Sequence, residues 1–254
     1  MPMIQSVERA LKILNLFDEY TTELKITEIS EKMGLHKSTV HSLLKTLQEY
    51  SYIDQNPEDG KYKLGLKLAE RGNVVISNID IRKAARKYLL DLSAKTGQTV
   101  HLGILDGREG VYVDKVEGEQ SIIRYSRIGR RLPLHSTAIG KVLLSFQDPQ
   151  EIKSLLKDYH YQQQTTSTIS NEAVFQKEIE KIQQQGFAVD NQENEQGVRC
   201  AAVPIFKGNG KVLAAISIST LVSRVNDQEL DVFIDLLKTS CQELSEQMRY
   251  AYDV

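Results

Sequence analysis

The chain has 254 residues, of which 41% are hydrophobic and 26% charged, a composition typical of a folded globular protein. It contains no run of about 18 apolar residues and no signal-peptide pattern, and its two cysteines are too few for a disulfide framework. We therefore expect a cytoplasmic protein with reduced thiols and no membrane span. The net charge of −2 does not by itself indicate a nucleic-acid partner.

The first predicted helix begins near Ser6, whose hydroxyl is expected to cap it. Apolar residues recur at helical spacing after this serine, and they predict one buried stripe, formed by Val7, Ala10, Leu11, Leu14 and Phe17. A loop over residues 21–25 follows. We expect the helix to pack beneath the two helices that come next.

Residues 27–50 predict a helix-turn-helix. A short helix over 27–33 reaches Gly34, and a longer helix runs from about Lys37 to Tyr50. The longer helix has an apolar stripe, formed by Val40, Leu43, Leu44 and Leu47, and a polar stripe, formed by Ser38, His41, Ser42 and Lys45. At roughly 100° per residue the two stripes point about 160° apart. Because no carboxylate lies between His36 and Gln48, the polar face suits the DNA major groove. The alternative is an ordinary surface helix in a helical hairpin.

A β-hairpin is predicted directly after this helix. Two short strands over 52–55 and 61–64 flank a turn that contains Pro57 and Asp59-Gly60. Together with the three helices they predict a winged helix-turn-helix. Residues 1–72 contain ten lysines and arginines against eleven acidic residues, so DNA binding depends on where the charges lie. Modest affinity per subunit, and hence a dimer or higher oligomer on DNA, is expected.

The expected DNA contacts are divided by chemistry. Ser38, His41 and Ser42 are the candidates for base edges, and Lys37, Lys45 and Lys61 of the wing are the candidates for phosphates, with Thr39 also at the interface. Residues 64–77 form a hinge region in which Leu66, Leu68 and Ala69 predict a short helix. This helix either pairs with its copy in a dimer or packs on its own domain.

The second part of the chain predicts an α+β domain around an antiparallel sheet. An amphipathic helix over 81–92 ends at Gly97, and strands over 99–105 and 111–116 flank the turn Asp106-Gly107, with a further strand over 122–125. A helix over 137–146, capped by Ser136 or Thr137, precedes a helix that opens at Asp148-Pro149 and ends near Lys157. After a loop over 159–168, Ser170 is expected to cap a helix over 171–185 that Gly186 closes.

The last elements complete the predicted sheet. A short strand over 187–190 and a polar loop over 191–196 precede two apolar strands, 198–206 and 212–221, joined by the hairpin signal Lys207-Gly208-Asn209-Gly210. A final helix, capped by Asn226 or Asp227, extends to about Tyr252.

Polar residues on these strands are candidates for a binding site. Asp190 ends a strand, and Cys200 lies in the first strand of the hairpin. Ser217 and Ser219 lie two apart in the other strand, so they face one side of the sheet together with Leu213 and Ala215. Two hydroxyls on an apolar face need backbone groups, water or a ligand as partners.

The segment 136–141 leads from a loop into a helix, whose free N–H groups suit an anion such as a carboxylate. Alternatively it is a capped helix in which Gly140 permits close packing and Lys141 is simply solvated. His135, Ser136, Asp190 and Cys200 are residue types used in nucleophilic catalysis, but no Gly-x-Ser-x-Gly elbow, Walker loop or cysteine-protease signature is present. His101, His135, His160 and Cys200 lack metal-ligand spacing. An enzyme, a cofactor or a metal is therefore not expected.

Over almost its whole length the chain resembles the IclR-type transcriptional regulators. The N-terminal resemblance lies in QSVERALKILNLFDE, ITEISEKMGLHKSTVHSLLKTLQEYSYI and KYKLGLKLAE, and the more specific C-terminal one in LPLHSTAIGKVLLS, GFAVDNQENEQGVRCAAVPIF and KVLAAISIS. It implies a winged helix-turn-helix domain over 1–65, a linker helix over 66–79 and an effector-binding, oligomerising domain with a GAF-like α+β fold over 80–254. It also implies homodimers, often paired into tetramers, on palindromic operators.

The resemblance carries an effector pocket onto particular residues of this chain. Asp190, Cys200, Ser217 and Ser219 fall where side chains hold the effector, and Ala138 and Ile139 fall where backbone N–H groups meet its carboxylate. The expected function is a regulator, acting as a repressor of a metabolic operon, controlled by a small organic acid or sugar acid. The alternatives are an enzyme, or a DNA-binding dimer without an effector.

Two residues depart from the family's pattern. His36 stands where the family usually has proline, directly before the DNA-facing helix, and it is expected either to alter the start of this helix or to add a phosphate contact. Ile139 is bulkier than the small residue often found at its position and is expected to shrink the pocket.

Overall fold

The computed structural model describes residues 3–119 and 126–252 and divides into two compact units, residues 1–78 and 79–254. Each unit has its own hydrophobic core. The strand predicted over 122–125 lies outside the described residues.

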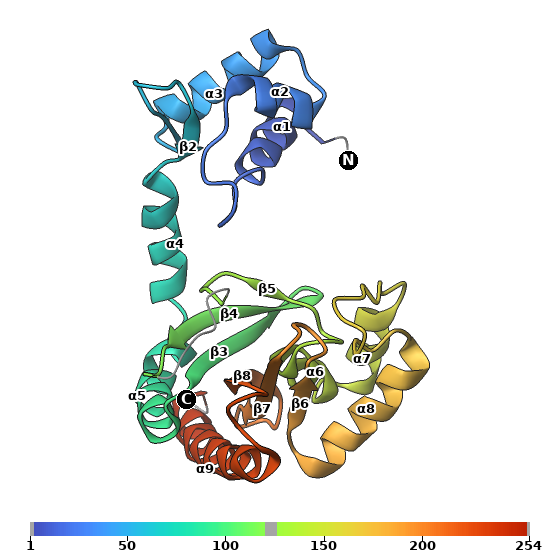
Figure 1. Cartoon of the computed structure of the whole chain (residues 1–254). Coiled ribbons are helices and arrows are strands. Elements are labelled where there is room, and N and C mark those ends of the chain that lie inside the picture. The colour runs from blue at the N-terminus through green and yellow to red at the C-terminus, as the bar shows by residue number, and fades with distance from the viewer. Residues whose placement is uncertain (1–2, 120–125, 253–254) are drawn as a thin grey trace. The chain divides into compact units, whose positions relative to one another are not determined.

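The N-terminal unit is a three-helix domain with a β-hairpin wing (Figure 1). Its helices are α1 (Gln5–Leu14), α2 (Ile26–Met33) and α3 (Lys37–Glu49); the antiparallel strands β1 (Ile53–Gln55) and β2 (Tyr62–Leu64) follow, and then α4 (Lys67–Ser77). The core contains Ile13, Phe17, Leu24, Ile29, Val40, Leu44, Ile53 and Tyr62. The predicted winged helix-turn-helix is confirmed, and the hinge helix α4 is longer than the short helix predicted there.

The prediction for the first helix was partly wrong. Val7 and Leu11 are 53% and 56% exposed, and Phe17 is buried beyond the end of α1. The helix carries two adjacent apolar stripes, and this unit buries the one that contains Ile13, a residue that the prediction omitted. No side chain caps α1, whose N-cap is Ile4 rather than Ser6.

The turn between α2 and α3 depends on two backbone conformations. Gly34 ends α2 with φ +61°, in the left-handed region that glycine tolerates. His36 precedes α3 with φ −62°, close to the angle that a proline ring would impose. The family's usual proline is therefore not needed for α3 to start as it does.

In its described residues, the C-terminal unit is built on a six-stranded sheet with the order β5-β4-β3-β8-β7-β6, in which every pair is antiparallel. The strands are β3 (Thr99–Asp106), β4 (Glu109–Val116), β5 (Arg131–Leu132), β6 (Ala188–Asn191), β7 (Val198–Phe206) and β8 (Val212–Leu221). The predicted antiparallel α+β fold is confirmed.

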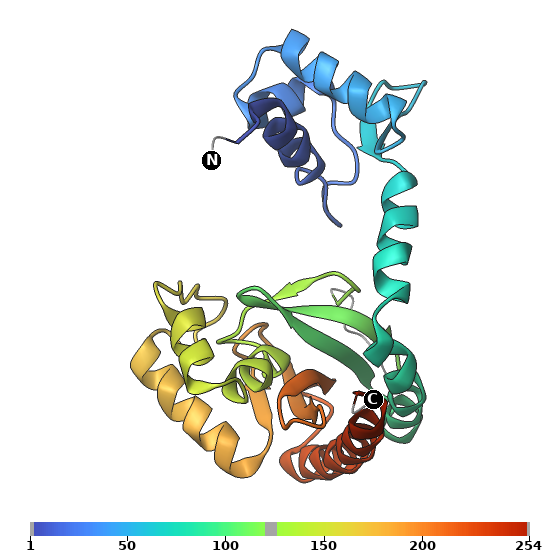
Figure 2. The same ribbon diagram turned by 180° about the vertical axis from the view of Figure 1, so that it is seen from behind.

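Helices cover both faces of this sheet (Figure 2). One face packs against α5 (Asp80–Thr96) and α9 (Asp227–Tyr252), and the other packs against α6 (Ala138–Ser145) and α8 (Glu172–Gln185), with α7 (Pro149–Leu156) beside these. Side chains of β7 alternate between the two layers: Ala201 and Val203 face α5 and α9, while Ala202 faces α6.

Two local predictions in this unit were wrong. Asn171, rather than Ser170, caps α8 by accepting a hydrogen bond from the Val174 N–H at 3.0 Å. Leu213 does not share a face with Ser217 and Ser219, because Ile205 pairs with Ala214 and Phe206 with Val212, which leaves Leu213 as the extra residue of a bulge. Ala215 does share that face.

Candidate functional site

The exposed face of α3 is the candidate DNA interface. Five of the seven predicted contact residues are exposed on it, and they are Lys37, Ser38, His41, Ser42 and Lys45. Thr39 is half-buried, and the Ser42 hydroxyl donates to the Ser38 carbonyl of the same helix at 3.1 Å. No side chain caps the N-terminus of α3, and its first turn contains no acid. These features leave the helix start suited to phosphate groups.

Lys61 of the wing differs from the lysines of α3. Its Nζ lies 3.1 Å from Asp59 Oδ2 and 3.6 Å from Glu23 Oε2. A phosphate would therefore have to compete with two carboxylates for this side chain. The sequence pattern did not indicate these two acidic partners of Lys61, Asp59 and Glu23.

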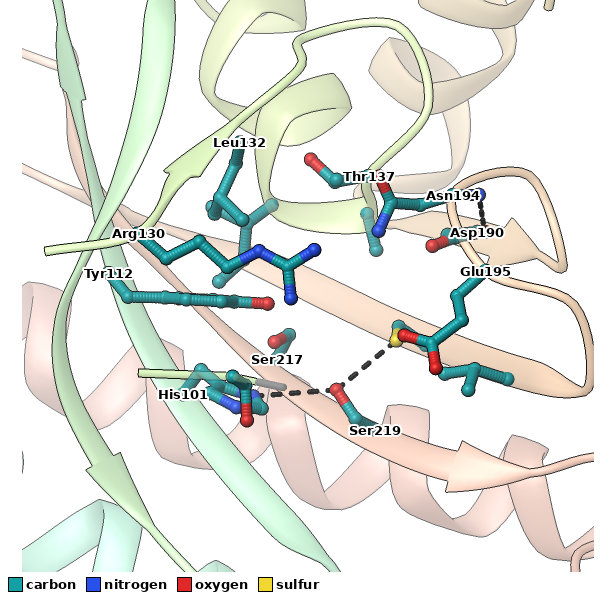
Figure 3. Close-up of a pocket in the computed structure, with 15 residues that line it drawn as sticks. His101, Tyr112, Arg130, Leu132, Thr137, Asp190, Asn194, Glu195, Ser217 and Ser219 are labelled. Atoms are coloured by element: carbon teal, nitrogen blue, oxygen red, sulfur yellow. Dashed lines mark hydrogen bonds between the residues drawn. The ribbon is translucent and has the colours of Figure 1, made fainter. Parts of the chain in front are cut away.

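The six residues proposed for effector binding gather around one cavity in the C-terminal unit (Figure 3). Ala138 and Ile139 enter from α6, Asp190 from β6, Cys200 from β7, and Ser217 and Ser219 from β8. The cavity is small, about 30 Å³, which is room for only a few water molecules. An organic acid would enter only if lining side chains moved.

Nine further described residues line this cavity: His101, Tyr112, Ser126, Arg130, Leu132, Thr137, Asn194, Glu195 and Val198. The sequence placed Thr137 in the segment expected to meet an anion, and it did not assign the other eight to the site. Figure 3 shows Arg130 and Glu195 pointing toward the middle of the cavity from opposite walls. Among the residues that the structure describes, the lining therefore combines one cation, two carboxylates and several hydroxyls, which suits a ligand with several oxygen atoms.

The N-terminus of α6 forms one wall. Thr137 caps the helix by accepting from the Gly140 N–H at 3.0 Å, which confirms one of the two predicted caps. A Cβ on Gly140 would lie 2.4 Å from the Pro133 carbonyl oxygen, so this glycine is required for close packing. Ile139 lies directly over Gly103 of β3, where an added Cβ would approach its Cγ2 to 2.6 Å. The missing side chain of Gly103 thus accommodates the bulk of Ile139.

Asp190 holds the loop that follows β6. Its Oδ1 accepts from the backbone N–H groups of Glu193 at 2.7 Å and Asn194 at 3.3 Å. Burial, together with the nearby Glu193 carboxylate, raises the pKa of Asp190 to about 7. Asn194 and Glu195 of this loop line the cavity. The hydrogen bonds that Asp190 accepts therefore help to position two of the lining residues.

Cys200, Ser219 and His101 form a hydrogen-bond chain along the cavity floor. The Cys200 thiol donates to Ser219 Oγ at 3.1 Å, and Ser219 Oγ lies 3.4 Å from His101 Nδ1. Burial raises the pKa of the Cys200 thiol and lowers the pKa of His101 to about 3, the latter with help from Lys115 and Arg130. Cys200 is thus a neutral thiol rather than a reactive thiolate.

Lys141 is completely buried, so the alternative in which it is simply solvated is wrong. Its Nζ donates to Glu178 Oε1 at 2.9 Å, to Glu193 Oε1 at 2.8 Å and to the Val189 carbonyl at 2.6 Å. A charge can be buried when such partners surround it. The lysine therefore joins α6, α8 and the loop after β6 behind the cavity wall.

Two other residues considered for catalysis or metal binding, His135 and His160, line a different pocket from the one that Asp190 and Cys200 line. His135 hydrogen-bonds to the Tyr159 hydroxyl and the Gln162 carbonyl, and it does not line the cavity. Within residues 3–119 and 126–252 no group of three His, Cys, Asp or Glu side chains is arranged to hold a metal ion. Nor does any helix in the described part of the chain have the length and apolarity needed to cross a membrane.

A winged helix-turn-helix with an exposed polar helix, joined to a second unit whose cavity is lined in part by charged and hydroxyl side chains, defines a DNA-binding regulator with a ligand-binding domain. Comparison with known proteins gives the same class. The model of the IclR helix-turn-helix domain matches residues 6–57, and that of the bacterial transcriptional regulator IclR C-terminal domain matches residues 73–246. The chain belongs to the IclR family of transcriptional regulators.

Individual relatives are similar over nearly the full chain. The HTH-type transcriptional regulator XynR of Escherichia coli is 56% identical, over 98% of this chain and 99% of its own. The regulator KdgR of Dickeya chrysanthemi is 39% identical, over 97% and 81%. The crystal structure of the Thermotoga maritima IclR is 38% identical and superposes with a TM-score of 0.79, over 97% of this chain and 99% of the other. These relatives are regulators, so the chain is a regulator and not an enzyme.

Proposed function

We propose that this protein represses a metabolic operon and that a small organic acid or sugar acid in the C-terminal cavity controls its binding to operator DNA. The observation that supports this proposal is the gathering of Asp190, Cys200, Ser217 and Ser219 with the N-terminus of α6 around one enclosed cavity. The free N–H groups of a helix start suit a carboxylate, and the hydroxyls and carboxyls opposite suit its other oxygen atoms.

In this proposal, residues 1–65 bind DNA, 66–79 form the linker and 80–254 bind the effector. Ser38, His41 and Ser42 of α3 contact base edges with Thr39 beside them, while Lys37, Lys45 and Lys61 contact phosphates. The protein acts in the cytoplasm, where bacterial DNA lies. The effector shifts DNA binding only by its different affinity for the arrangements of the protein that do and do not fit the operator.

The proposed assembly is a homodimer that can pair into a tetramer. Apolar side chains are exposed on α1, on its N-cap and on α4 of the single chain, and they are Val7 and Leu11, Ile4, and Val74 and Val75. Exposed apolar side chains of this size are common at protein–protein interfaces. A dimer also supplies the two recognition helices that a palindromic operator requires.

The experiment is a thermal-shift panel of small 2-oxo acids, sugar acids and aromatic acids on the wild type and on Ser217→Ala. An acid present at 100 times its Kd should stabilise the wild type by about 2.7 kcal/mol, and the variant should lose most of this shift. Operator binding measured with and without that acid then shows whether it releases the protein. No stabilisation by any acid, together with unchanged DNA binding by Ser217→Ala, would instead support a DNA-binding dimer without an effector.

A further inference from the structure

His101 occupies the cavity floor, and neither the family resemblance nor the relatives assign it a role. It lies in β3 opposite Ser217 of β8 and is 1% exposed. Its ring stacks on Tyr112, with ring centroids 4.4 Å apart and planes 22° apart. The stacking and the neighbouring strands fix the ring's orientation, so its two nitrogen atoms have distinct surroundings.

The hydrogen-bond chain favours one position for the imidazole proton, the one that the first test below measures. Ser219 Oγ accepts from the Cys200 thiol, so the one hydroxyl hydrogen of Ser219 is available for His101 Nδ1. Nδ1 is then an acceptor, and a neutral imidazole with an acceptor at Nδ1 holds its proton at Nε2. Burial keeps the ring neutral at physiological pH, since it lowers the pKa of His101 to about 3.

The Nε2 atom is the unusual feature of this side chain. It is buried and has no hydrogen-bond partner within residues 3–119 and 126–252. Ser126 Oγ, which lines the same cavity, is in the same state. Leaving a buried donor without an acceptor is unfavourable, and such groups in native proteins generally meet water or a ligand. Here the donor belongs to a residue that lines the cavity.

We propose that His101 binds the effector, donating its Nε2–H to an oxygen atom other than the carboxylate that meets the start of α6. Figure 3 shows His101 and Thr137, the cap of α6, on opposite sides of the cavity. The effector therefore carries a hydroxyl or carbonyl oxygen in addition to its carboxylate. This inference rests on the proposed function, because it concerns the same cavity and the same effector.

The first test concerns the proton and needs no effector. Nitrogen NMR of the full-length protein with labelled histidine reports the tautomer of each of the five histidines, and the His101→Phe variant identifies the signal of His101. The expected result is a neutral ring with the proton on Nε2 from pH 6 to pH 8, and a mixture of tautomers in Ser219→Ala. A proton on Nδ1, or a ring that titrates between pH 6 and pH 8, would overturn the proposal.

The second test compares acids that differ only in their extra oxygen atoms. The probes are gluconate with hexanoate and 2-oxobutyrate with butyrate, each titrated calorimetrically into the wild type, His101→Phe and His101→Gln. His101→Phe keeps an aromatic ring on Tyr112 but has no donor, and glutamine restores one. We expect the preferred oxygenated acid to bind His101→Phe about ten-fold more weakly than the wild type, with partial recovery in His101→Gln and little change for its partner acid.

The control is His160→Gln, at an exposed histidine outside the cavity, which should bind every probe as the wild type does. Equal affinity of the wild type and His101→Phe for the oxygenated acid, or no preference of the wild type for either oxygenated acid, would overturn the inference. If no acid bound the wild type, the proposed effector class would be wrong, while the NMR measurement would still decide the position of the proton.

Discussion

Asp190 holds a carboxyl group in surroundings that disfavour its charge. It is almost completely buried, and its Oδ1 accepts two backbone N–H groups of the loop after β6. These hydrogen bonds favour the carboxylate, but burial and the Glu193 carboxylate outweigh them and raise the pKa to about 7. The residue is therefore close to half-ionised at neutral pH, whereas in the unfolded chain it ionises near its ordinary value of 3.8.

Asp190→Asn should remove a pH dependence of stability. Between pH 4 and pH 7 the unfolded chain releases a proton that the folded protein retains, so the wild type loses up to about 1.4 kcal/mol of its free energy of unfolding per pH unit as the pH rises. Above pH 7 both states are ionised and this loss stops. Asparagine stays neutral and can still accept the two N–H groups, so the variant should gain stability relative to the wild type from pH 5 to pH 7.

Urea denaturation of both proteins from pH 5 to pH 9 measures this difference. The raised pKa of Glu193 contributes a slope of the same sign to both proteins, so only the difference between them is informative. Asp148→Asn, at an exposed carboxyl, is the matched control. A difference between Asp190→Asn and the wild type that is constant with pH, or that falls as the pH rises, would contradict the assignment.

Some of the residues that line the cavity could be predicted from the sequence, and others could not. Asp190, Cys200, Ser217 and Ser219 were identified because they are polar residues in apolar strands and because the family resemblance carries a role onto them. His101 and Tyr112 also lie in strands, but they reach the cavity through the pairing of β3 with β8 and β4. A single sequence does not give that register, so these two residues appear only in the folded protein.

The burial of helix α6 also depends on contacts that a single sequence does not give. Its residues are buried all around, including Lys141, whose charge suggested an exposed position. The partners of Lys141 come from α8 and from the loop after β6, which lie 37 and 52 residues further along the chain. Sequence spacing indicated a capped helix with a tightly packed Gly140, and the structure confirms this, but the burial of the lysine depends on distant acids.

Replacing Lys141 with methionine should strongly destabilise the C-terminal unit. The variant removes the cation from between Glu178 and Glu193 and leaves their carboxylates without it. Breaking a buried ion pair by removing one partner typically costs about 3–5 kcal/mol. The free energy of unfolding, measured by urea denaturation, should fall by this amount.

Lys211→Met is the matched control, because Lys211 pairs with Asp148 on the surface, where both side chains are more than half exposed. Its effect should be close to zero because water and salt screen such a pair. Similar losses of unfolding free energy in the two variants would contradict a stabilising role for the buried ion pairs of Lys141. The double variant Lys141→Met, Glu193→Gln should recover part of the loss, since it also removes one of the unpaired carboxylates.

The ends of strands could be predicted where residues adjacent in the sequence determine them. The strands 198–206 and 212–221 were predicted with the bounds that β7 and β8 have, because both are apolar runs that flank a glycine-rich turn. The buried face of α1 was not predictable in the same way, because two apolar stripes lie side by side and only contact with the rest of the unit selects one. The bulge at Leu213 likewise depends on pairing with β7.

At the scale of the whole molecule, charge placement rather than total charge has to account for DNA binding. The chain carries a net charge of −2, and ten basic residues face eleven acidic ones in positions 1–72. The lysines of α3 stand on a helix face whose first carboxylate is Glu49, in its last turn, and within the described residues no ion pair joins Lys37 or Lys45 to an acid. Lys61 of the wing already has two carboxylate partners. Counterion release depends on the cations that actually neutralise phosphates, so these lysines should contribute unequally.

Lys45→Ala should therefore flatten the salt dependence of operator binding more than Lys61→Ala does. Each phosphate contact contributes roughly 0.9 to the slope of log K against log salt concentration, so the proposed dimer, in which both subunits would lose Lys45, should lose about 1.8. Lys61 must exchange Asp59 and Glu23 for a phosphate, and its net contribution should be smaller.

Fluorescence anisotropy with a labelled operator fragment at several salt concentrations measures the slopes, and Lys211→Ala, in the C-terminal unit, controls for the loss of a charge elsewhere. An unchanged slope for Lys45→Ala would show that α3 does not place this lysine on a phosphate, and a larger loss for Lys61→Ala would assign the main phosphate contact to the wing.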